Sequence, residues 1–183
     1  DDLESGKDFG RYLDVDGDGI PFRTYPGTHP TKGAYFTRGT TKDRYARYSE
    51  EGPVYVDNMQ RLLKKFETAK RLVPQAIARP AKHPTKLGIL YFGSTAPAMN
   101  EALDAFDEQG INVDALRVRA FPFGEEVVDF LEDHEQVFVV EQNRDAQLRS
   151  LIMNEAGIDA SKLIPIVHYD GTPITARFIT REI

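Results

Sequence analysis

The sequence predicts an α/β domain with a parallel sheet and helices on both of its faces, preceded by an extended N-terminal arm and one helix. Two observations predict this fold class. From Lys86 onward, short apolar runs alternate with segments whose apolar residues repeat at helical spacing. Residues 1–52 instead hold many turn-forming residues and show little periodicity. We therefore expect an arm at 1–52, a helix and linker at 53–85, and the α/β domain at 86–183.

One helix is expected directly after the arm. Apolar residues from Met59 to Phe66 repeat at helical spacing, which favours an amphipathic helix. Glu67 and Arg71 are placed to pair across one helical turn. The helix should end before Pro74, and the three prolines within residues 74–85 indicate a linker.

Four strands are expected in the α/β domain. They are predicted at Leu87–Phe92, 116–120, Val137–Val140 and Leu163–Val167. Continuous apolar runs such as Leu87–Phe92 are typical of strands buried on both faces of a parallel sheet. The run at 116–120 alternates apolar residues with arginines, which indicates that one face of this strand is more exposed to water.

A helix is expected after each strand. The four helices are predicted from Pro97 to Gly110, at Glu125–His134, at Ala146–Ala156 and from Pro173 to Ile179. Ser94 or Thr95 should cap the first helix, and Thr172 should cap the last. Gly157 follows the third helix, where glycine favours the backbone conformation that closes a helix.

The loops after the strands are where we look for a functional site. Parallel strands end at one edge of their sheet, and the loops on that edge bind ligands or partners. The ligand or interface candidates there are Gly93, Ser94, Thr95, Glu141, Asn143, Gln147 and His168. Buried carboxylate and amide groups such as those of Glu141 and Asn143 require partners.

The turn at residues 93–95 has two interpretations. Its amides could hold an anion at a helix N-terminus, but the turn lacks both G-x-G-x-x-G and a P-loop lysine. An ordinary turn and helix cap would use the same residues, and we favour that interpretation. No nucleophile, base and orienting group can be assembled from the chain, so no catalytic residue is predicted.

An acidic loop in the arm resembles a calcium site. Asp14, Asp16, Asp18 and Gly19 match the first half of an EF-hand loop. The bidentate glutamate that should end such a loop is replaced by Tyr25. A weak cation site and a solvated turn both remain open for these residues.

Charge is unevenly distributed along the chain. Residues 21–72 carry 11 basic and 5 acidic groups, whereas residues 86–183 carry 8 and 17. The basic segment could face phosphates or an acidic partner, or lie against the acidic domain. Arg23, His29 and Arg38 are candidate contacts for a carboxylated ligand, with structural ion pairing as the favoured alternative. The arginines form no recognised nucleic-acid-binding module, so nucleic acid is not expected as a partner.

The composition excludes several classes of site. The 183 residues include no cysteine, which excludes disulfides and thiolate ligation of zinc or iron–sulfur clusters by this chain. No apolar run approaches the roughly 20 residues that span a bilayer, and no signal peptide opens the chain, so no membrane contact is expected. The absence of cysteine is compatible with a reducing compartment, so a cytoplasmic location is expected. The first residue is aspartate, which suggests a fragment of a longer polypeptide.

Three segments together resemble a known family. They are FGRYLDVDGDGIPFRTYPGTHPTKGAYFTRG, YVDNMQRLLKKFETAKRLVP, and VFVVEQNRDAQLRSLI followed by KLIPIVHYDGTPITARFI. In this order they closely resemble the C-terminal third of the α subunit of 2-oxoacid:ferredoxin oxidoreductases, and the 2-oxoglutarate type is the nearest likeness. The resemblance runs from about Phe9 to the C-terminus.

The resemblance implies a complex that oxidatively decarboxylates a 2-oxo acid with thiamine diphosphate and magnesium. Such a complex reduces ferredoxin through an iron–sulfur cluster and forms an acyl-coenzyme A. The β subunit would hold the diphosphate and the cluster, and the upstream domains of the α subunit would be further partners. By this resemblance residues 1–52 are a crossover arm with a solvated acidic turn, and residues 86–183 are a transketolase C-terminal-like domain. The fragment alone should bind no cofactor and be inactive.

Overall fold

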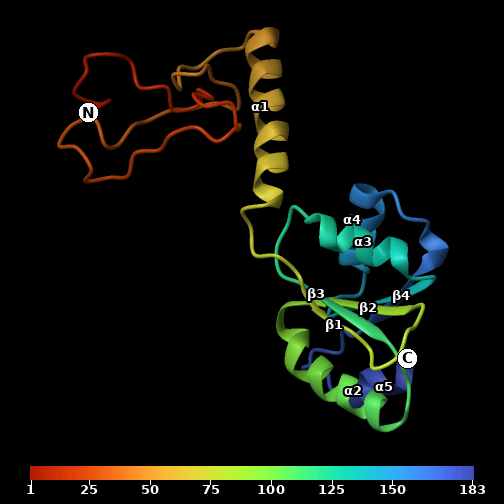
Figure 1. The fold of residues 1–183 in the computed structure, drawn as a ribbon. Coiled ribbons are helices and arrows are strands. Elements are labelled where there is room, and N and C mark those ends of the chain that lie inside the picture. Colours follow the sequence, from red (N-terminus) through yellow and green to blue (C-terminus); the bar gives the residue numbers. More distant parts are fainter. The chain divides into compact units, whose positions relative to one another are not determined.

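The computed structural model describes residues 1–183, which form two compact units, Asp1–Leu72 and Val73–Ile183. Figure 1 shows both units and labels most of their helices and strands. The first unit contains the arm and α1, and the second contains the sheet. None of the helices combines the length and the apolarity that crossing a membrane requires.

The arm in the first unit consists of loops and turns. Its one β-type pairing is an isolated antiparallel bridge between Lys42 and Tyr48. The acidic turn lies against α1, where Thr68 Oγ1 donates to the Asp18 carbonyl at 2.6 Å. Gly19 has a φ of +80°, and a Cβ at this position would lie 2.5 Å from the backbone nitrogen of Lys65. Only glycine therefore allows the turn to approach the helix this closely.

Helix α1 spans Gly52–Lys70 and ends before Pro74, as predicted. It buries none of its residues, although its apolar side chains repeat at helical spacing. The predicted pairing of Glu67 with Arg71 is wrong. Glu67 instead pairs with Lys70 at 3.0 Å, because Arg71 lies beyond the last helical residue.

The second unit is built on a five-stranded sheet in the order β1-β3-β2-β4-β5. The strands are β1 (Ile77–Arg79), β2 (Leu87–Phe92), β3 (Asp114–Val118), β4 (Gln136–Glu141) and β5 (Leu163–Val167). All neighbouring pairs are parallel except β1 with β3. This confirms the predicted α/β fold class.

Strand β1 lies in residues that we expected to form a linker. It pairs with β3 through Ile77–Arg117, Ala78–Leu116 and Arg79–Ala115. Because β1 has only three residues and stands between prolines, it has no periodicity that sequence analysis could detect. The second unit consequently begins at Val73 rather than at Lys86.

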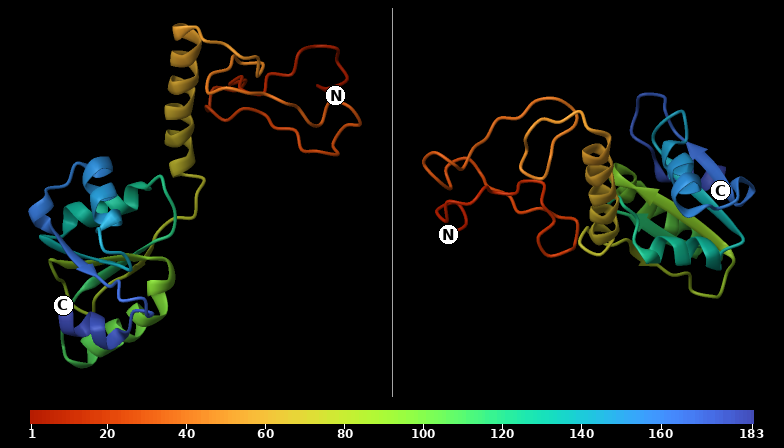
Figure 2. Two further views of the ribbon diagram at one scale, coloured as in Figure 1. Left: turned by 180° about the vertical axis from the view of Figure 1, so that it is seen from behind. Right: turned by 90° about the horizontal axis from the view of Figure 1, so that it is seen from above.

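Helices cover both faces of the sheet, as predicted. They are α2 (Ala96–Glu108), α3 (Glu125–Asp133), α4 (Gln147–Ala156) and α5 (Ala176–Glu182), with short 3-10 turns η1 (Gly93–Thr95) and η2 (Ala160–Lys162). Figure 2 shows α2 and α5 together on one face and α3 and α4 on the other. Gly157 ends α4 with a φ of 64°, the left-handed conformation expected of a closing glycine.

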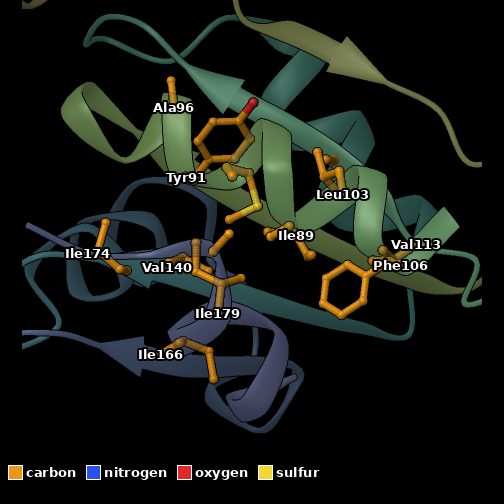
Figure 3. Close-up of a cluster of buried hydrophobic side chains, with 14 residues drawn as sticks. Ile89, Tyr91, Ala96, Leu103, Phe106, Val113, Val140, Ile166, Ile174 and Ile179 are labelled. Carbon is orange, nitrogen blue, oxygen red and sulfur yellow. The ribbon is translucent and has the colours of Figure 1, made fainter. Parts of the chain in front are cut away.

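Two apolar cores fill the space between sheet and helices. Ile89 and Tyr91 of β2 point to the α2 and α5 side, whereas Leu90 points to the α3 and α4 side. Figure 3 shows the first core, which contains Ile179 of α5 and Val140 of β4. This alternation explains the apolar runs in the sequence, because both faces of the strands are buried.

One predicted helix cap is right in position only, and another is wrong. Thr95 is the N-cap residue of α2, but its side chain accepts no cap hydrogen bond, and Ser94 lies in the turn η1. Helix α5 begins at Ala176, and its cap is Thr175, whose side chain accepts from Phe178 N at 3.2 Å. Thr172 is not the cap because its amide and hydroxyl both donate to Asp170 Oδ1, at 2.8 and 2.7 Å.

Candidate functional site

The loops that follow β2 and β4 meet at the carboxyl edge of the sheet. The two strands are neighbours, but the chain leaves them toward opposite sides of the sheet. Parallel sheets usually bind ligands in the crevice at such a point. The sequence-predicted segments at 93–95 and 141–147 are therefore brought together at the expected place.

Gln142 bridges this crevice. Its Nε2 donates to Ser94 Oγ at 3.1 Å and to Thr95 Oγ1 at 3.2 Å. Its Oε1 accepts from Ile174 N at 3.3 Å. One side chain thus joins the loops after β2, β4 and β5. Gln142 lies between the two candidates Glu141 and Asn143 but was not itself a candidate residue, because nothing in the local pattern shows that its amide reaches another strand.

Glu141, the last residue of β4, is 0% exposed. Its carboxylate accepts from Leu148 N at 2.8 Å and from Arg149 N at 3.1 Å, both in the first turn of α4. Asn143 Nδ2 donates to the same carboxylate at 2.7 Å. A helix N-terminus offers its amides and dipole to an anion, and here the anion is a side chain of the same chain.

Asn143 completes this arrangement. Its Oδ1 accepts from Asp145 N and Gln147 N, both at 3.2 Å. These bonds hold the turn that leads into α4, where Ala146 adopts the left-handed backbone conformation with a φ of 48°. Both polar groups that the sequence singled out after β4 therefore have their partners in their own loop and in the first turn of α4.

An apolar hollow of about 480 Å³ lies beside these residues. Phe92, Phe123, Leu148 and Leu151 contribute to its lining, together with the predicted candidates Gly93 and Gln147. The Phe123 ring packs edge-on against Phe121 with centroids 5.3 Å apart. Sequence analysis missed this hollow as a site, although two phenylalanines directly after a strand were a usable signal. The lining is mainly apolar and suits an apolar group, although Arg117 and Arg119 also contribute to it.

His168 follows β5, and its side chain is 10% exposed. Its ring packs edge-on against Phe178 with centroids 4.8 Å apart, and its Nδ1 is buried with no hydrogen-bond partner. Its Nε2 lies 3.5 Å from Asp170 Oδ1. The hydroxyl of Thr172, followed by its amide, lowers the pKa of Asp170 below the ordinary value. The His168 ring is therefore held mainly by packing contacts within the fold.

The three candidates in the arm do not converge. Arg23 and Arg38 are exposed. His29 Nε2 lies 2.7 Å from Glu4 Oε1, and its Nδ1 accepts from Thr31 N at 3.1 Å and Lys32 N at 2.9 Å. Because Nδ1 accepts, the ring proton lies on Nε2 and is donated to Glu4. His29 is therefore a structural element of its loop.

The acidic turn has carboxylates close enough to share a cation. One oxygen from each of Asp14, Asp16 and Asp18 lies within 4.8 Å of the others. However, Asp14 Oδ1 accepts from Gly17 N and Gly19 N, and Lys64 Nζ lies 3.2 Å from Asp14 Oδ2. The Gly19 amide is the main cause that lowers the pKa of Asp14. These hydrogen bonds and this ion pair hold the turn within the protein itself, and the cation site stays a prediction.

Among the comparisons with known proteins, only the one with solved structures finds a match. No protein-family model and no curated protein matches the chain. One similar structure is a 2-oxoglutarate:ferredoxin oxidoreductase from Magnetococcus marinus, solved with 2-oxoglutarate, coenzyme A and succinyl-CoA bound. The match has a TM-score of 0.79 and 20% sequence identity, and it covers 98% of this chain. This chain has the fold of one part of that oxidoreductase.

The chain spans 31% of the length of the oxidoreductase chain that it matches. A second similar structure is the alpha chain of a probable 2-oxoacid ferredoxin oxidoreductase from Thermoplasma acidophilum. It is 26% identical over 59% of this chain and 92% of its own, with a TM-score of 0.40. The likeness of fold to the first structure agrees with the resemblance that the three sequence segments carry.

Proposed function

We propose that this chain is the C-terminal part of the α subunit of a thiamine-dependent 2-oxoacid:ferredoxin oxidoreductase of the 2-oxoglutarate type. The observation that carries the proposal is the structural match over 98% of the chain, which includes the arm as well as the sheet. The order of the three sequence segments supports the same assignment. In the complete complex, a 2-oxo acid would be decarboxylated oxidatively to an acyl-coenzyme A while ferredoxin is reduced.

Within that complex the chain would be a structural and interface element. The polar groups at the carboxyl edge of its sheet bond to one another through Gln142, Glu141 and Asn143, so none of them is prepared to hold a reacting atom. The alternative of an anion- or cofactor-binding module is less well supported, because Glu141 already uses the first amides of α4.

The cofactors of such a complex do not fit the residues of this chain. An iron–sulfur cluster needs thiolate ligands, and the sequence has no cysteine. At the carboxyl edge of the sheet, the diphosphate of thiamine diphosphate would find no free helix N-terminus at α4, because the first amides of α4 are taken by Glu141. Both cofactors, with magnesium, would therefore be held by the β subunit and the upstream domains of the α subunit, in the cytoplasm.

The arm and α1 would supply most of the contact with those partners. Of the large apolar side chains that are exposed, most lie in the first unit, and Phe36 is 88% exposed. Side chains of this kind gain free energy when a partner removes them from water. Ferredoxin and coenzyme A would be reached through the assembled complex rather than through this chain alone.

Co-expression tests the proposal. The chain would be produced with the β subunit and the remainder of the α subunit, purified as a complex, and assayed with coenzyme A, an electron acceptor and several 2-oxo acids. We expect activity, with 2-oxoglutarate as the best substrate, only when all parts are present. A complex that forms and turns over equally well without residues 1–183 would refute the proposal. Activity of the chain alone would refute its non-catalytic role.

A further inference from the structure

A hollow of about 390 Å³ in the arm has four cationic residues among the ten that line it. Lys7, Arg11, Lys32 and Arg47 contribute to the lining, and Asp8 is the one carboxylate among the lining residues. Arg47 forms an ion pair with Asp8, so these two charges offset each other. Three positive charges remain without a lining carboxylate to balance them.

The bonds of Arg11 and Lys32 go to neutral oxygen atoms. Arg11 donates through Nη1 to Thr24 Oγ1, and through Nη2 to the Lys32 carbonyl at 3.0 Å. Lys32 Nζ donates to the Leu3 carbonyl at 2.6 Å. Hydroxyl and carbonyl oxygens position a cation without cancelling its charge. Most N–H groups of both side chains also remain available to a ligand.

Aromatic rings fix the guanidinium of Arg11 in place. Its carbon lies 4.0 Å from the centroid of the Tyr35 ring and 5.2 Å from that of Phe9. Such contacts restrict the side chain, so it loses less conformational freedom when it binds a ligand. The wall that carries Lys32 is held as well, because its amide donates to His29 Nδ1 at 2.9 Å. The cationic hollow is therefore largely formed before any ligand arrives.

We propose that this hollow binds a phosphate-bearing small molecule through Lys7, Arg11 and Lys32. Like charges gathered around one hollow repel one another, and a ligand group with two or more negative charges offsets that repulsion better than a monocarboxylate does. Phosphate oxygens also accept hydrogen bonds from a guanidinium in pairs. A volume of about 390 Å³ lies within the range of roughly 300–1,000 Å³ that small-molecule sites occupy. The inference does not depend on the function proposed above.

The test uses inorganic diphosphate as the probe and the full chain as the protein. Isothermal titration calorimetry would measure affinity at low ionic strength, and amide chemical shifts would locate the site. We expect saturable binding with shifts confined to the lining, including the amides of Gly6 and Lys7. Acetate at the same concentration should produce neither heat nor shifts.

Lys7→Met is the sharpest variant, because the one hydrogen bond of Lys7 runs from its backbone amide to Ser5 Oγ and does not involve the side chain that is replaced. It should weaken diphosphate binding about ten- to a hundredfold, as loss of one charge-assisted hydrogen bond implies. Arg38→Met is the matched control, because Arg38 is an exposed cation of the same arm outside the hollow. Its affinity should equal that of the unchanged chain.

Three results would overturn the inference. Unsaturable binding would show that no site exists. Equal weakening by Lys7→Met and Arg38→Met would show diffuse attraction to a basic arm. Random-coil amide shifts throughout residues 1–50 would show that the chain does not form the hollow.

Discussion

Glu141 illustrates how a side chain that resembles a ligand can belong to the framework. A carboxylate at the end of a buried strand, on the edge where such sheets bind ligands, is a reasonable candidate from sequence. In the structure it is completely buried and accepts three hydrogen bonds, two of them from the first turn of α4. Its negative charge stabilises the positive end of that helix.

Replacing Glu141 with alanine should therefore destabilise the second unit. Two buried amides and the Asn143 side chain would lose their acceptor, which should lower the free energy of unfolding by about 2–4 kcal/mol. Urea denaturation followed by circular dichroism would measure the change. Glu155→Ala is the control, because Glu155 is exposed on the same helix. Equal losses in the two variants would contradict the capping role.

The contribution of Asp170 to the stability of the fold should depend on pH. The Thr172 hydroxyl and amide lower its pKa below the ordinary value of 3.8, so its folded pKa lies below its unfolded pKa. Its stabilising contribution is therefore fully present above the ordinary value and is lost as the pH falls through the lower folded value. Carboxyl shifts in a pH titration should show this, and Thr172→Val should raise the pKa. An unchanged pKa in that variant would contradict the assigned cause.

Among the elements, α1 differs most from what its sequence pattern suggests. Its apolar residues repeat as those of a core-facing helix do, yet none of its 19 residues is buried in this chain. Leu63 is 61% exposed, whereas Leu103 of α2 is 3% exposed. The periodicity reports that a face is apolar, but it does not report what covers the face.

Matched leucine substitutions test this difference. Leu63→Ala should change the free energy of unfolding of the chain by less than about 0.5 kcal/mol, because little apolar area is lost. Leu103→Ala should cost about 2–5 kcal/mol, because it leaves a cavity in the first core. Chemical denaturation of both variants would measure these values. A large loss in Leu63→Ala would mean that α1 is covered within the chain itself.

The sequence predicted elements well where burial alone decides them. Strand β2 has the predicted bounds because its four central residues are buried. Strand β5 also has the predicted bounds, although it is an edge strand in which only Leu163 and Ile166 are buried. Strand β1 was not predictable, because it depends on pairing with β3 and on Arg79, which bonds to Asp104 at 2.7 Å and Asp107 at 3.2 Å. The candidate site was also predictable only in part. The edge of the sheet at which it lies could be predicted from topology, whereas the bridge through Gln142 depends on a contact across strands.

At the scale of the whole molecule, the two units differ in what stabilises them. The second unit has two apolar cores, whereas the buried residues of the first are Gly19 and Gly33. Hydrogen bonds and ion pairs such as Arg44 with Asp57, at 2.9 Å, hold the first unit. Exposed pairs of this kind contribute little, so the first unit should open far more readily.

Amide hydrogen exchange would measure that difference. We expect the slowest exchange in β2 and β4, at the centre of the sheet, and exchange faster by orders of magnitude throughout residues 1–51. Under the proposed function, adding the β subunit and upstream domains should slow exchange in the first unit while leaving β2 and β4 nearly unchanged. Comparable protection of both units in the isolated chain would contradict this account.

The short strand β1 has a practical consequence for anyone who wishes to study the sheet by itself. A recombinant fragment that starts at Lys86, where the sequence places the domain boundary, would lack the strand that shields β3. The uncovered backbone of β3 could then recruit other molecules edge to edge, and such samples should precipitate. Starting at Val73 retains the shield and the anchoring of Ala81 N by Asp114 Oδ1 at 2.7 Å.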